Sequence, residues 1–224
     1  MRKSIIALSL AVPAFALAAS QAPLIAQTAH QLTTKQSSEV ALKNAKTLTA
    51  GTYTADSGHT LIGWRVNHFG FNDYFGIFGD STGTLAIDPA NPAAAKVDIT
   101  IPVSKVTTAS AGLTSHLTKA AEAGKKPDFF GANAADARFV STKVTLDNEG
   151  DEAKVEGNLT LNGVTKPVVL DVELSGAGRN GMNKKETLGF EAETKIRRSD
   201  FGIDFGTQLV SDEVELEITV AFEK

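Results

Sequence analysis

Four long segments in the second half of the chain are apolar at every other residue. They span 151–162, 166–176, 186–198 and 213–223, and the last alternates Val214, Leu216, Ile218, Val220 and Phe222 with mostly polar residues. Because successive side chains of a strand point to opposite faces, each segment has one apolar and one solvated face. Eight such strands closed on themselves enclose either packed side chains or one ligand. The pattern therefore favours a barrel around a hydrophobic interior.

The strand patterns are separated by turn residues, as expected for an all-β fold. We predict eight strands, near 59–69, 74–88, 95–103, 138–148, 151–162, 166–176, 186–198 and 213–223. Asn162-Gly163 matches the preferred turn of a β-hairpin. Between Ser110 and Gly131 the two-residue period is lost, and Leu113 and Leu117 recur at helical spacing. This segment predicts an insertion with a short helix, placed across a barrel mouth or packed on its side.

The N-terminal residues predict export. Arg2 and Lys3 precede an apolar stretch that ends in small residues, which is typical of a signal peptide over residues 1–18. The stretch is too short for a membrane span of roughly 20 residues, although an uncleaved anchor is the alternative. Residues 19–50 read as a flexible tail, weakly helical at best between 39 and 46, and residues 51–224 as the barrel domain. We expect a periplasmic protein without an integral membrane span.

Charge and cysteine content exclude several partners. Of 22 basic and 26 acidic residues, the first 18 positions hold two basic ones, so the exported chain would carry 20 against 26, a net charge of −6. Nucleic acid is therefore not expected as a partner. The chain has no cysteine, so neither a disulfide nor a cysteine-linked lipid anchor is possible.

The candidate ligand-binding residues follow from strand faces and from the abundance of phenylalanine. Trp64, Val66 and His68 share the apolar face of one strand, and His68 ends this row at the expected barrel rim. The chain has 12 Phe residues against two Tyr and one Trp. They form either a packed core or the lining of an apolar cavity. The candidate lining residues are Trp64, Val66, His68, Phe69, Phe75, Phe78, Leu117, Phe129, Phe130, Phe139, Leu159, Leu170, Phe190 and Ile218.

Motifs for catalysis and metal binding are weak. Residues 79–83 match the Gly-x-Ser-x-Gly pattern of serine hydrolases, but that motif needs a following helix, whereas the flanks here predict strand. His59 and His68 are separated by an odd number of residues and so lie on opposite faces of their strand. We expect no catalytic residue, no metal and no cofactor. Two alternatives stay open: an enzyme that acts on a lipid head group with His68 as acid or base, and a ligand-free structural stress protein.

Several motifs carry a family resemblance. The segments 56–60 (Asp-Ser-Gly-His-Thr), 64–70, 157–168 and 198–203 (Arg-Ser-Asp-Phe-Gly-Ile) resemble the YceI-like, polyisoprenoid-binding periplasmic proteins, and the likeness runs from Tyr53 to the C-terminus. The resemblance implies an eight-stranded antiparallel, lipocalin-like barrel whose pore holds a long isoprenoid chain. It also implies a homodimer in many members and no established catalytic activity.

Two departures from the family pattern fall near the expected mouth. Thr114 and Ser115 precede His116, where the family usually has an acidic residue, and ten residues separate Leu117 from the Asp-Phe-Phe segment at 128–130. Asp136 and the three residues after it replace the usual Tyr-Pro.

Together, the apolar strand faces and the resemblance predict a periplasmic carrier of a polyprenyl or quinone-like lipid. They do not define the head group or the chain length.

Overall fold

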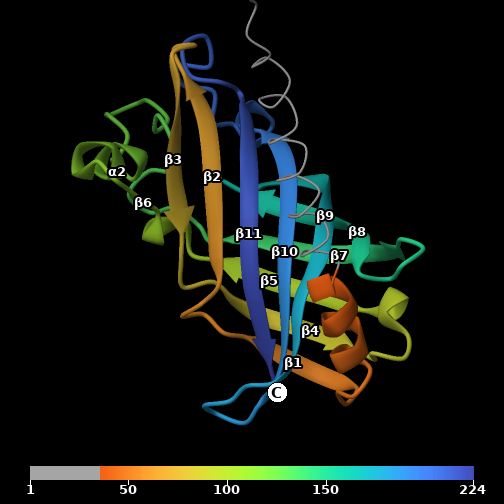
Figure 1. The fold of residues 1–224 in the computed structure, drawn as a ribbon. Coiled ribbons are helices and arrows are strands. Elements are labelled where there is room, and N and C mark those ends of the chain that lie inside the picture. The colour runs from red at the N-terminus through yellow and green to blue at the C-terminus, as the bar shows by residue number, and fades with distance from the viewer. Residues whose placement is uncertain (1–35) are drawn as a thin grey trace, which may run out of the picture. The chain divides into compact units, whose positions relative to one another are not determined.

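Eight antiparallel strands of the computed structural model close into a barrel (Figure 1). The structure describes residues 36–224, so the predicted signal peptide and residues 19–35 lie outside the described part. Around the ring the strands are β1 (Gly51–Ala55), β4 (Thr82–Ile87), β5 (Lys96–Ile101), β7 (Ala137–Leu146), β8 (Glu152–Leu161), β9 (Val164–Arg179), β10 (Glu186–Arg197) and β11 (Glu213–Glu223). Pairing of β1 with β11 completes the ring. The predicted eight-stranded antiparallel barrel is confirmed.

A second group of strands extends one wall of the barrel. β2 (Leu61–His68), β3 (Asn72–Phe78) and β6 (Thr107–Thr108) follow β11 in the sheet. β1 and β2 share one edge of β11: Ala55 pairs near its C-terminal end and Trp64 pairs with Leu216 nearer its start. The barrel therefore has two different ends, which we call the closed end, at β1, and the mouth, at the β2–β3 turn.

The predicted helical insertion is present beside this wall. Helix α2 (Ala111–Leu117) follows β6, and the Ser110 side chain caps it by accepting a hydrogen bond from the Leu113 amide. Three short 3-10 turns lie at Pro92–Ala94, Val103–Lys105 and Arg198–Phe201. Helix α2 of the insertion lies next to the mouth, and Leu113, His116 and Leu117 line the apolar interior there.

The predicted strand at 74–88 is wrong as a single element. The chain turns after Phe78, with Asp80 at a φ of 56°, and begins β4 at Thr82. The glycines in this stretch had suggested curvature within one strand, but a left-handed residue breaks the pairing instead. Strands β1 and β6 were not predicted, because neither is long enough to display a period.

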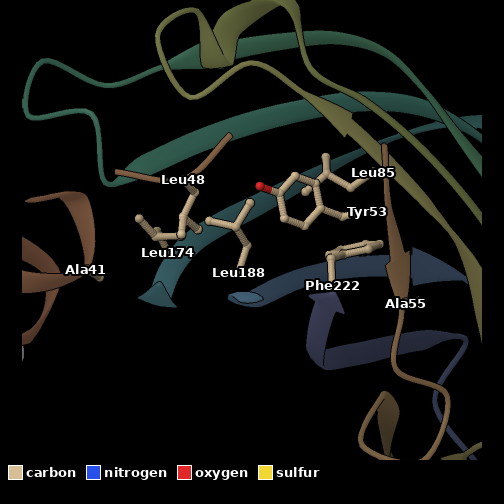
Figure 2. Close-up of a cluster of buried hydrophobic side chains, with 8 residues drawn as sticks. All are labelled: Ala41, Leu48, Tyr53, Ala55, Leu85, Leu174, Leu188 and Phe222. Atoms are coloured by element: carbon tan, nitrogen blue, oxygen red, sulfur yellow. The ribbon is translucent and has the colours of Figure 1, made fainter. Parts of the chain in front are cut away.

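The last part of the predicted flexible tail belongs to the packed domain. Residues 36–45 are helical, and Ala41 and Leu48 are buried in a cluster with Tyr53, Leu188 and Phe222 (Figure 2). Burial of these apolar side chains offsets the entropy of ordering the segment. The segment thus contributes to the core at the closed end.

A buried carboxylate fixes this segment in place. Glu186, which is 7% exposed, accepts hydrogen bonds from the Thr49 amide at 3.0 Å, the Thr49 hydroxyl at 2.7 Å and the Tyr53 hydroxyl at 3.1 Å, and it pairs with Arg179. The bonds from the Thr49 amide and hydroxyl, followed by Tyr53 and Arg179, lower the pKa of Glu186 to about 2. The charged form therefore holds residue 49 against the start of β10.

Candidate functional site

Two adjoining apolar cavities lie within the barrel and its extended wall. The outer cavity, of about 550 Å³, opens at the mouth between β2, β3, α2 and the segment that precedes β11. The inner cavity, of about 190 Å³, lies within the closed ring. Ile62, Ile101, Leu159 and Leu216 line both cavities, so these four side chains lie between the two.

Strand alternation explains the lining of the outer cavity. Ile62, Trp64, Val66 and His68 occupy alternate positions of β2 and all line it. The Trp64 ring lies against Gly76 of β3, where a side-chain Cβ would overlap the indole. Glycine at this position therefore makes room for the only tryptophan of the chain.

All but one of the predicted lining residues border a cavity. The outer cavity contains Trp64, Val66, His68, Phe69, Phe78, Leu117, Phe129, Phe130 and Leu159. The inner cavity contains Phe139, Leu159, Leu170, Phe190 and Ile218. These positions come from seven strands, the insertion and the β2–β3 turn, and the fold gathers them around two adjoining cavities.

Phe75 is the exception, and its predicted place in the lining is corrected. It pairs directly opposite Arg65 on β2, and residues opposite each other in an antiparallel pair share a face. Arg65 lies on the outer face, where it pairs with Glu215 and Asp73. Phe75 is accordingly 60% exposed, and its neighbour Tyr74 lines the outer cavity instead.

The sequence analysis missed several mouth residues. Tyr74 could have been found from its pairing position opposite Val66. Ile203, Phe205 and Leu209, by contrast, belong to a segment without secondary-structure period, so no local pattern marked them as lining. They complete the side of the mouth that faces the insertion.

Arg198 determines the course of that segment. It is 6% exposed and lines the outer cavity, yet its guanidinium donates to the backbone carbonyls of Ile203, Phe205, Val210 and Ser211 at 2.7–3.2 Å. Desolvation by burial lowers the pKa of Arg198. Because these carbonyls occupy most of its donors, Arg198 serves to shape the mouth and is poorly placed to bind an anionic head group.

The polar side chains of the outer cavity gather at its mouth. His116 on α2 bonds Asp128 through Nε2 at 2.8 Å, and its ring lies edge-on to Phe129 and Phe205 with centroids 5.2 and 5.7 Å apart. His68 lies edge-on to Phe69 at 4.5 Å. Two aromatic rings thus flank His116 and one flanks His68, so a ligand group that reaches the mouth meets a few polar atoms on an apolar surface.

The Gly-x-Ser-x-Gly motif at 79–83 does not form a hydrolase site. Ser81 is fully buried in the turn between β3 and β4, and a strand follows it, so residues 79–83 do not form the strand-turn-helix of a nucleophile elbow. Within residues 36–224 no three metal-ligating side chains come together. Nor does any helix in this range have the length and apolarity that crossing a membrane requires.

Comparisons with known proteins agree with this architecture. A model of the YceI-like domain matches residues 53–222. Protein YceI of Salmonella arizonae is 42% identical over 163 residues, which cover 72% of this chain and 80% of the relative. The crystal structure of the Campylobacter jejuni YceI protein is 31% identical, with a TM-score of 0.59, covering 70% of this chain and 89% of that one. A polyisoprenoid binding domain from Saccharophagus degradans has the same fold, with a TM-score of 0.54, 13% identity and coverage of 78% and 99%.

Proposed function

This chain belongs to the YceI-like family, and we propose that it is a periplasmic carrier that holds an apolar isoprenoid-type lipid, polyprenyl or quinone-like, in its joined cavities. The observation that carries the proposal is the pair of adjoining apolar cavities, which are separated by only four side chains. The outer cavity alone falls within the range of ligand sites, about 300–1,000 Å³. A long, flexible hydrocarbon chain fits this shape better than a compact ligand does.

The lining also suggests which way the lipid enters. Among the residues that line the inner cavity, the polar ones are Thr60 and Thr194, and their hydroxyls donate to the carbonyls of Asp56 at 2.7 Å and Val169 at 2.8 Å. A polar head group buried there would lose its hydration and find no free donor. The hydrocarbon chain should therefore lie inward, with the head group at the mouth near His68 and His116.

A carrier accounts for the site better than the two alternatives. Acid-base catalysis by His68 would need a second polar group beside it, and within the described part of the chain no side chain is hydrogen-bonded to His68. A ligand-free structural protein would fill its interior, since native cores pack with few voids larger than a water molecule. The volume of the two cavities argues against that reading.

Tryptophan fluorescence tests the proposal. Because Trp64 is the only tryptophan and lines the outer cavity, a quinone-headed isoprenoid that enters the lumen should quench its emission saturably. Val66→Asp should abolish quenching, since an unpaired carboxylate in an apolar lining is strongly unfavourable. Val169→Asp is the matched control, because Val169 is 46% exposed. Equal quenching in both folded variants would contradict lipid binding in the lumen.

A further inference from the structure

We propose that the barrel mouth docks on a lipid bilayer through an exposed apolar rim, which we define as Phe69, Phe71, Phe205 and Leu209. These side chains are 47%, 89%, 46% and 56% exposed. The inference rests on the proposed function, because docking would let a lipid pass between a bilayer and the outer cavity. It adds a surface and a partner to that function.

The rim consists of two chain segments held together. The Phe69 amide donates to the Leu209 carbonyl at 2.7 Å, and His68 forms a β-bridge with Val210. In Figure 1 the β2–β3 turn and the blue segment that precedes β11 stand side by side at the top of the barrel. Phe69 and Gly70 both have positive φ, at 58° and 73°, which turns the chain sharply and presents Phe71 at the tip. The four side chains therefore form one small surface at the mouth.

The rim is continuous with the cavity lining. Phe69, Phe205 and Leu209 are exposed on one side and border the outer cavity on the other. Phe71 lines neither cavity and is the most exposed phenylalanine among those exposed large apolar side chains. An exposed apolar patch of this kind marks an interaction surface. Lipid crossing this rim would stay in contact with apolar side chains and avoid water.

The size of the rim favours a bilayer over a protein partner. A large aromatic side chain can bury at most about 150–250 Å², so the exposed fractions of these four amount to roughly 450 Å². A stable protein interface buries about 800 Å² on each partner. Binding to a bilayer surface, however, has no such minimum area, because its strength scales with the apolar area that becomes buried.

Charges near the mouth do not oppose this contact. Although the exported chain would carry a net charge of −6, two carboxylates here are paired with cationic side chains: Asp73 with Arg65 and Asp204 with Lys126. The Lys126 pair lowers the pKa of Asp204 and so keeps that carboxylate charged and bound to its partner. These two pairs reduce the repulsion between the mouth and an anionic bilayer surface.

The test is co-sedimentation of the purified exported chain, without residues 1–18, with vesicles of phosphatidylethanolamine and phosphatidylglycerol. Phe71→Ser should weaken vesicle binding by at least about tenfold, and Phe71→Ser with Leu209→Ser should weaken it further. Met182→Ser is the matched control: Met182 is 94% exposed but lies in the β9–β10 turn at the closed end, and its loss should leave binding unchanged. Thermal unfolding checks that all variants fold.

Three outcomes overturn the proposal: equal vesicle binding by all variants, no vesicle binding by the unmodified chain, and a change of oligomeric state in Phe71→Ser without a change in vesicle binding. The last would make the rim a contact between copies of the chain. Trp64 quenching by a water-soluble short isoprenoid, measured on the same samples, separates the two hypotheses. Quenching retained in Phe71→Ser while vesicle binding is lost supports docking as a separate step. Quenching absent in every sample, with vesicle binding still dependent on Phe71, refutes the carrier and leaves docking supported.

Discussion

Filling the inner cavity should shorten the lipid chain that the protein can hold. Ala192 on β10 is 7% exposed and lines this cavity, so Ala192→Phe places a ring in a space of about 190 Å³. At roughly 30 Å³ for each CH₂-sized group, that space holds about six such groups. At about 0.8 kcal/mol for each buried group, the loss for a long lipid has an upper limit of about 5 kcal/mol. This limit corresponds to an increase in Kd of roughly a few thousandfold.

The assay is Trp64 quenching with a series of isoprenoids of increasing length. In the unmodified protein, affinity should rise with length until both cavities are full, whereas in Ala192→Phe it should stop rising once the outer cavity, with room for roughly 18 groups, is occupied. Short isoprenoids should bind both proteins equally. Ala86→Phe, at an exposed position of β4, is the control, and urea unfolding should show little loss of stability because the new ring enters a void. A uniform loss at every length, or no loss at any length, would refute the assignment of the inner cavity to the lipid chain.

Three further predictions concern titration and the mouth. Glu186→Gln should lower the urea midpoint at neutral pH, because the depressed pKa of Glu186 stabilises the fold only while the carboxylate is charged. The difference should shrink as pH falls from about 4.5 and be lost as pH passes below about 2; a difference that does not shrink over this range would contradict this. Arg198→Met should leave the four backbone carbonyls without their donor. We expect the free energy of unfolding in urea to fall by roughly 3 kcal/mol or more, and amide hydrogen exchange at 203–211 to increase. Unchanged protection of these amides would contradict the role of Arg198 in shaping the mouth. A polyprenyl phosphate should bind His68→Gln more weakly than the unmodified protein, whereas a neutral quinone should bind both equally. Equal affinity of the phosphate for both proteins would move the head-group site away from His68.

The long strands of the barrel could be predicted from the sequence because their side chains obey one local rule. The pattern at 213–223 gives the bounds of β11, and the predicted 186–198 differs from β10 by one residue. Cavity-lining positions such as Leu170 and Ile218 follow from the same alternation. The alternation of side chains along the strands therefore predicts most of the strands and most of the residues that line the inner cavity.

The rest depends on contacts between segments distant in sequence. Leu48 is buried through a segment tied to Glu186, 137 residues from Thr49, and the course of the mouth depends on Arg198 bonds to carbonyls that no pattern marks. The error at Phe75 has a different cause. Phe75 and Phe78 are an odd number of residues apart in one strand, so the alternation rule itself places them on opposite faces. The sequence analysis placed both residues in the cavity because they belong to a cluster of phenylalanines, and it did not apply the alternation rule to them.

Native mass spectrometry of the protein purified from cells without detergent tests the carrier most directly. The proposed function predicts a mass above that of the polypeptide, corresponding to one apolar lipid that organic extraction removes and that an added isoprenoid replaces. A polypeptide mass without any adduct, unchanged after addition of isoprenoids of every length, would contradict it.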